Sequence, residues 1–179
     1  MIMNITDLLK DPNKIKKVLW KAIKDKNKEA AETLISVVKD PELTYEYARN
    51  IVKGKIKDEW EDIIATNPTY SYRYAEKVLK GPFPKGEDSI AKDYWCSYYY
   101  AYEVLKGPFP KGEDVIAKNP NYSYLYADLI LKDRFIEREK AIIRNRNYLK
   151  DYMKFLKQIG KLEEFLNDHP RVKPNLTNL

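Results

Sequence analysis

The sequence has few of the residue types on which most enzymes and metal proteins depend. It contains one cysteine, Cys96, and one histidine, His169, among 179 residues. A single cysteine excludes an internal disulfide and a cysteine metal cluster, so we expect Cys96 to be a small apolar filler. His169 falls in the expected C-terminal tail, which argues against a histidine-centred triad and against histidine metal ligands. We therefore expect no catalytic residues, no metal, no cofactor and no enzymatic activity.

Long apolar runs are also missing. No stretch of 18 or more apolar residues occurs, and residues 1–6 lack the basic and apolar regions of a signal peptide. The glycines at 81 and 107 stand before proline, so no phosphate-binding loop is indicated. We expect a single domain over residues 1–179, no membrane contact and a cytoplasmic location.

Charge is unevenly distributed along the chain. The net charge is +6, from 33 Lys and Arg against 27 Asp and Glu. Residues 1–28 carry 8 basic against 3 acidic side chains, residues 132–161 carry 10 against 4, and residues 29–131 carry 13 against 17. The ends are basic and the middle is acidic, which argues against one continuous track for phosphates.

The central part of the chain is a tandem repeat. Residues 81–88 (GPFPKGED) recur unchanged at 107–114, a spacing of 26 residues. The segment at 64–75 (IATNPTYSYRYA) recurs in related form at 90–101 and 116–127. A fixed period of this length is typical of stacked supersecondary units.

Each unit is expected to form two helices. A short first helix begins at Gly86-Glu-Asp, and a second runs from about residue 68, 94 or 120 to residue 80, 106 or 132. We expect Gly81 and Gly107 to end the second helix. The paired carboxylates, such as Glu113-Asp114, are explained by the helix dipole and are not expected to be catalytic.

We predict an all-α fold: an α-solenoid of stacked short helix pairs with atypical capping helices at both ends. Residues 1–40 form the N-terminal cap, with helices after Thr6, at 12–24 and at 28–39. The repeats cover 41–132, a degenerate copy and C-terminal cap cover 133–168, and residues 169–179 form a flexible tail.

Tyrosines and serines on the second helix are expected to be mostly core. The apolar arc of that helix spans about 200°, too wide for one neighbour, so helices should flank it on both sides. Ser71 and its counterparts fall inside the arc, where a hydroxyl can bond to a backbone carbonyl. Phe83 and its counterparts should plug the core under the turn.

Positions outside the arc vary between copies. They change from charged groups in the first copies to aromatic and apolar groups in the third and fourth. With a tryptophan nearby they define an expected protein-binding patch: Arg73, Trp95, Tyr99, Tyr102, Leu125 and Leu129. Alternatively, the C-terminal cap covers this face.

A basic group near the C-terminus is a second candidate site. It contains Arg134, Arg138, Arg144, Arg146 and Lys150, and could hold nucleic acid or an acidic partner. It could equally be an ordinary solvated surface, because Glu137, Glu139 and Asp151 partly neutralise it. The N-terminal lysines, such as Lys17, Lys21 and Lys24, have the same two interpretations.

The unit IAKNPNYSYLYA, together with the motif GPFPKGE, resembles a short Tyr-rich helical repeat found in phage and large-virus proteins. The resemblance covers about residues 41–152 and implies a viral or mobile-element origin, with the host cytoplasm as the working compartment. Together with the varied face, it leads us to expect a non-enzymatic protein-binding module that occupies, and in one version inhibits, a host protein or defence complex. Nucleic-acid binding through the basic ends is the alternative function.

Overall fold

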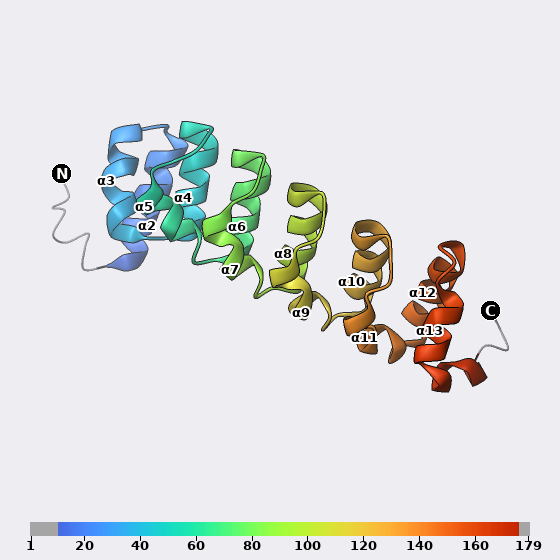
Figure 1. The fold of residues 1–179 in the computed structure, drawn as a ribbon. Coiled ribbons are helices and arrows are strands. Elements are labelled where there is room, and N and C mark those ends of the chain that lie inside the picture. The colour runs from blue at the N-terminus through green and yellow to red at the C-terminus, as the bar shows by residue number, and fades with distance from the viewer. Residues whose placement is uncertain (1–10, 176–179) are drawn as a thin grey trace. The chain divides into compact units, whose positions relative to one another are not determined.

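The computed structural model describes residues 11–175, and every regular element within that range is helical. The helices are short and pack in pairs, which confirms the all-α, repeat-like prediction. Figure 1 shows the helices along the chain, coloured from the N-terminus to the C-terminus. The chain divides into two compact units, one ending at Ile90 and the other beginning at Ala91. None of the helices in the described range is long and apolar enough to cross a membrane. The helix expected after Thr6 lies outside the described residues.

From residue 11 onward, the first unit has two helices of the N-terminal cap and then repeat copies. Asp11 caps the first helix and Asn27 the second, each accepting backbone N–H bonds at the helix start. The elements of this unit are α2 (Pro12–Lys24), α3 (Lys28–Val38), α4 (Pro41–Tyr47), η1 (Ala48–Val52), α5 (Asp58–Ile64), α6 (Pro68–Arg73), η2 (Tyr74–Leu79), η3 (Pro84–Gly86) and α7 (Glu87–Ile90). Helices α4 and α5 form one pair, and α6 and α7 the next.

The second unit repeats this plan and ends in the C-terminal cap. Its elements are α8 (Tyr94–Tyr99), η4 (Tyr100–Leu105), η5 (Pro110–Gly112), α9 (Glu113–Ile116), α10 (Pro120–Leu125), η6 (Tyr126–Leu131), η7 (Ile136–Arg138), α11 (Lys140–Ile143), α12 (Arg146–Gln158), α13 (Leu162–Asp168) and η8 (Pro170–Asn175). Helix α10 packs against both α8 and α12, so the wide apolar arc does face two neighbours.

The second helix of each copy has an unexpected form. It begins as an α-helix and finishes as a π-helix in η1, η2, η4 and η6. Lysines, not the expected glycines Gly81 and Gly107, take the left-handed conformation that ends it: Lys80 and Lys106 both have φ of 53°. The last copy differs, since α12 is a regular α-helix of 13 residues.

Close packing at the two central turns depends on a glycine and a hydroxyl residue, Gly86 beside Ser71 and Gly112 beside Ser97. A Cβ added to Gly86 would lie 2.8 Å from the Cβ of Ser71 and 2.4 Å from a ring carbon of Phe83. Ser71 Oγ donates to the carbonyl of Ile64 at 3.0 Å, as expected. The plug residues Phe83 and Phe109 are each 2% exposed, which confirms the predicted slot.

In three copies a buried tyrosine bonds to a glutamate that stands 13 residues earlier in the chain. Tyr126 Oη donates to Glu113 at 3.1 Å and accepts the backbone N–H of Phe109 at 2.7 Å. Tyr74 makes the same two bonds, to Glu61 at 2.9 Å and from Ile56 at 3.1 Å. The expectation that the helix dipole alone explains these glutamates is therefore incomplete, because they also accept from a buried phenol.

Candidate protein-binding face

Six aromatic side chains gather on three elements of the second unit, α8, η4 and α10. They are Tyr94, Trp95, Tyr98, Tyr99, Tyr102 and Tyr122. Helical spacing of four residues places two pairs in contact. The rings of Trp95 and Tyr99 lie 4.6 Å apart, and those of Tyr98 and Tyr102 stack at 6.0 Å with 7° between their planes. We call this set the aromatic face.

Tyr122 links the aromatic face across two packed helices. Its ring lies 5.2 Å from Tyr94, 5.1 Å from Tyr98 and 6.4 Å from Tyr99. Asp93 fixes the start of α8 by accepting the N–H of Cys96 at 2.8 Å. Edge-to-face contacts of this kind hold rings in defined orientations, so the cluster is positioned before any partner arrives.

The inner rings of the face are buried and the outer ones are open. Tyr98 is 4% exposed, and burial raises the pKa of its phenol to about 12. Tyr94 and Trp95 are each 38% exposed and Tyr102 is 41% exposed. Large aromatic groups left partly open on a supported base are typical of interaction surfaces.

The structure brings together three of the six predicted residues, Trp95, Tyr99 and Tyr102. Leu125 is half-buried on α10, and Leu129 is 43% exposed on η6. Arg73 belongs to the first unit, where its guanidinium lies 5.9 Å from the ring of Tyr70.

The C-terminal cap does not cover this face. The second unit includes both the aromatic face and the cap, and Trp95, Tyr102 and Leu129 are exposed within it. The alternative in which the cap buries these side chains is therefore wrong.

Sequence reasoning missed three members of the face. Tyr94 stands where Pro68 and Pro120 begin the equivalent helices, and Tyr98 and Tyr122 were assigned to the core stripe. A usable pattern was present, because Tyr94 and Tyr98 stand four residues apart, as do Trp95 and Tyr99.

The lysine beside Tyr102 on the aromatic face is already engaged. Lys106 Nζ lies 3.2 Å from Glu103 and 5.8 Å from the ring centre of Tyr102. The face therefore offers ring surface and hydroxyls more than free charge.

Arg134, predicted as part of the basic surface group, is buried. It is 6% exposed, and its Nε and Nη2 donate to the two oxygens of Glu139 at 3.0 and 2.9 Å. Nη1 forms ion pairs with Glu164 at 3.1 Å and Asp168 at 2.8 Å. Arg134 is thus unavailable to a phosphate, and the expectation for this residue is corrected.

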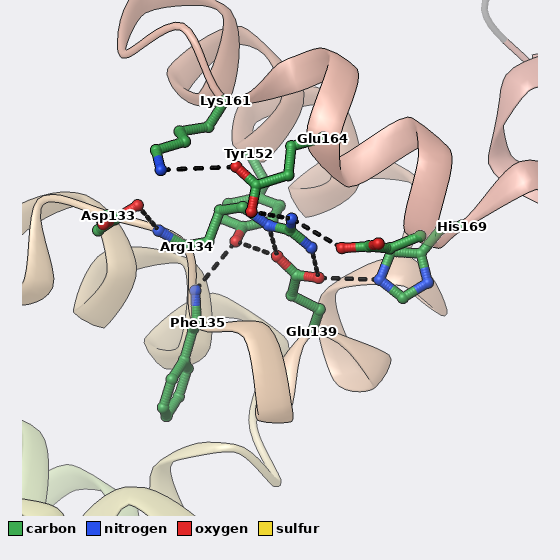
Figure 2. Close-up of polar contacts among 9 residues, drawn as sticks. Asp133, Arg134, Phe135, Glu139, Tyr152, Lys161, Glu164 and His169 are labelled. Carbon is green, nitrogen blue, oxygen red and sulfur yellow. Dashed lines mark hydrogen bonds and ion pairs between the residues drawn. The ribbon is translucent and has the colours of Figure 1, made fainter.

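Glu139 is the centre of this buried network (Figure 2). Besides Arg134, it accepts from Tyr152 Oη at 2.7 Å, and His169 Nε2 lies 2.8 Å from its other oxygen. The hydrogen bond to Glu139 raises the pKa of Arg134, while burial and the same carboxylate raise the pKa of Tyr152. The carboxylates of Glu139, Glu164 and Asp168 balance the buried charge of Arg134, while its Nη1 is held by ion pairs rather than by a well-directed hydrogen bond.

The expected flexible tail is also partly corrected. His169 is half-buried against Glu139, and Pro170–Asn175 form a 3-10 helix. Residues 176–179 lie outside the described part of the chain.

The other residues of the basic group differ in their exposure and in their ion pairs. Arg138 is half-buried and pairs with Asp114 at 2.8 Å and Glu137 at 3.1 Å. Arg144, Arg146 and Lys150 are exposed, and among the described residues no ion pair is recorded for them. Within residues 11–175, no group of three or more His, Cys, Asp or Glu side chains is arranged to hold a metal ion.

Comparisons of the chain with models of protein families, with curated proteins and with solved structures found no match.

Proposed function

We propose that this protein is a non-enzymatic protein-binding module and that the aromatic face is its docking surface. The observation that supports the proposal is a cluster of six aromatic rings in contact with one another. Two of its outer members, Trp95 and Tyr102, are 38% and 41% exposed. Tyrosine and tryptophan supply large contact area with little conformational entropy to lose, and they are enriched among the residues that dominate binding energy.

The repeat frame supports this function. Interior positions keep their bonds between copies, as the Tyr74–Glu61 and Tyr126–Glu113 pairs do. Outward positions change from copy to copy, and only the third copy concentrates aromatics. A rigid scaffold that carries a varied surface is the arrangement by which repeat proteins recognise partners.

The face favours protein over nucleic acid. Phosphate binding needs available cations, whereas Lys106 beside Tyr102 is paired with Glu103. A polar rim and an aromatic centre with hydroxyl groups are instead typical of protein interfaces. In line with the resemblance to viral repeats, the partner we propose is a protein of the host cell.

Affinity capture with matched variants tests the proposal. We expect wild type and Trp20→Ser, which removes an exposed aromatic from the first unit, to recover the same partner from host extract. The double variant Trp95→Ser, Tyr102→Ser should recover at least about tenfold less, since central interface aromatics often contribute 2 kcal/mol or more each. Equal melting temperatures of the three proteins are the control. Equal recovery by the double variant would remove the aromatic face as the site.

A second candidate function is nucleic-acid binding by the exposed side chains Arg144, Arg146 and Lys150. The burial of Arg134 and the pairing of Arg138 leave this group smaller than the sequence suggested. Its test is an electrophoretic shift at low salt with wild type and with Arg144→Glu, Arg146→Glu. A shift that is absent, or that the double variant leaves unchanged, would eliminate this group.

A further inference from the structure

A basic depression lies in the first unit, beside helix α2. Its lining comes from the C-terminal half of α2, the turn after it, η1 and the lysine that ends η1. The lining residues are Trp20, Ile23, Lys24, Lys26, Arg49, Asn50 and Lys53, and the volume is about 470 Å³. Helix α2 packs against helix α4, and η1 is the continuation of α4 (Figure 1). We call this feature the α2 depression.

Its lining carries four cations and no carboxylate. No ion pair is recorded for Lys24, Lys26 or Lys53 among the described residues, and all three are exposed. Arg49 approaches Glu46 only to 4.0 Å, and the other oxygen of Glu46 accepts from Asn50 at 2.6 Å. The positive charge of the depression is therefore largely uncompensated.

Trp20 provides a flat apolar surface among these cations. Its side chain is 48% exposed, the largest exposed fraction among the described aromatic residues, and Ile23 beneath the depression is 2% exposed. Lys17 and Lys21 share its side of α2, because residues 17, 20, 21 and 24 follow helical spacing. Cations thus extend along the helix beyond the depression itself.

An exposed indole surrounded by available cations matches the chemistry of a single nucleic-acid strand. An unpaired base stacks on an aromatic ring while flanking phosphates contact Lys and Arg. A duplex keeps its bases stacked on one another and cannot offer one to Trp20. An acidic peptide would use the cations but leave the indole without a planar partner. The volume lies within the usual range for small-ligand sites, which suits a single nucleotide unit.

We propose that the α2 depression binds single-stranded nucleic acid, with one base stacked on Trp20 and adjacent phosphates held by Lys24, Lys26, Arg49 and Lys53. This site is independent of the aromatic face, which lies in the other unit and carries the proposed protein-binding function. Lys17 and Lys21 would follow the strand outward along α2.

Fluorescence anisotropy with a labelled 12-nucleotide single strand tests the site in the full chain. We expect Trp20→Ser to weaken binding about tenfold without changing the salt dependence, and Trp20→Phe to retain most of the affinity. Lys24→Gln with Lys53→Gln should lower the slope of log affinity against log salt by about 1.4, since each neutralised phosphate contributes about 0.7. Lys118→Gln with Lys157→Gln, two exposed lysines of the other unit that belong to no proposed site, is the matched control and should leave both quantities nearly unchanged.

Competition identifies the ligand. Unlabelled single strand should displace the probe, while the same sequence as a duplex and a poly-glutamate peptide should compete at least about tenfold less well. Mononucleotide should compete weakly, because it contacts only part of the track. Wild-type affinity in Trp20→Ser, or equal competition by duplex or by poly-glutamate, would overturn the proposal. None of these results bears on the aromatic face.

Discussion

The Tyr126–Glu113 pair of a central repeat and the Tyr152–Glu139 pair of the last copy share one geometry but have different neighbours. In both, the phenol donates to the glutamate and accepts a backbone N–H, from Phe109 or Phe135. Glu113 is half-buried, so water can complete its hydrogen bonding. Glu139 is 1% exposed and is completed by Arg134 and His169.

The position before the plug residue accounts for this difference. Central copies have proline there, Pro82 and Pro108, where the last copy has Arg134 and the first has Lys55. Lys55 Nζ lies 3.8 Å from Glu61, whose residue is 3% exposed. Copies that bury the glutamate therefore carry a cation at this position. A buried carboxylate is costly without an opposite charge. Arg134 supplies that charge from a buried side chain, whereas Lys55 approaches Glu61 from a largely exposed one.

Alkaline titration should produce the largest effect, because the buried tyrosines of three copies contribute together. Burial, with further contributions from the neighbouring carboxylates, raises the pKa of Tyr74, Tyr126 and Tyr152 in the folded state. Their stabilising contribution is complete below the unfolded pKa near 10 and falls as pH rises above it. Three such groups lower the free energy of unfolding by about 4 kcal/mol per pH unit above pH 10.

The measurement is absorbance at 295 nm together with far-ultraviolet circular dichroism. Ionisation of the buried phenols should coincide with loss of helix. If the 295 nm change is complete by pH 11 while helix content is intact, the phenols are not buried as described.

Substitution of the residue before the plug should change the free energy of unfolding by different amounts in different copies. Arg134→Met leaves Glu139 buried with less compensation and should lower the free energy of unfolding by about 3 to 5 kcal/mol. Lys55→Met should cost about 1 kcal/mol or less, because the Lys55 side chain is 63% exposed and its ion pair is screened by water. Pro108→Met, the matched control in a central copy, should also cost less than about 1 kcal/mol.

Urea unfolding followed by circular dichroism gives these three values. The comparison between copies fails if Arg134→Met and Pro108→Met shift the midpoint equally.

The smallest effect should arise where the copies agree. Lys106 in a central copy and Lys132 before the last copy both have φ of 53°, a conformation that L-residues adopt at a cost. Lys106→Gly and Lys132→Gly should each stabilise the protein by about 0.5 to 1 kcal/mol. Lys118→Gly, at an exposed position without positive φ, should destabilise it slightly. Thermal melts measure all three, and destabilisation by Lys106→Gly would contradict the helix-end geometry.

The repeat made the frame largely predictable from sequence. Aligned copies placed the helix pairs, the Phe83 and Phe109 plugs and the buried tyrosines, because each feature recurs at the same offset. Ser71 Oγ bonds to a backbone carbonyl as expected. Capping chemistry correctly placed the start of α2, and apolar periodicity placed α3, whose cap Asn27 was not identified.

The π-helices, the burial of Arg134 and part of the aromatic face were not predicted, because they depend on which residues are neighbours in space. A periodicity of about 100° per residue does not separate an α-helix from a π-helix over one turn, so η2 and η4 were missed. Arg134 was assigned to the surface on charge alone, although the burial of Glu139 decides its position. The Tyr–Glu pairs were detectable, since the two residues stand 13 apart in three copies. Of the aromatic face, the sequence predicted Trp95, Tyr99 and Tyr102 but not Tyr94, Tyr98 and Tyr122.

The most direct test of the central claim is a paired measurement of stability and partner affinity in two variants. The claim is that a repeated interior supports a separate, varied docking surface. Tyr126→Phe removes the phenol that accepts the Phe109 N–H, so it should lower stability by about 1 to 3 kcal/mol. Its affinity for the captured partner, measured below its melting temperature, should equal that of wild type. Trp95→Ser with Tyr102→Ser should lower that affinity at least about tenfold and leave stability within about 1 kcal/mol. The claim is wrong if Tyr126→Phe weakens binding as much as the double variant does. It is also wrong if the double variant binds the partner with wild-type affinity.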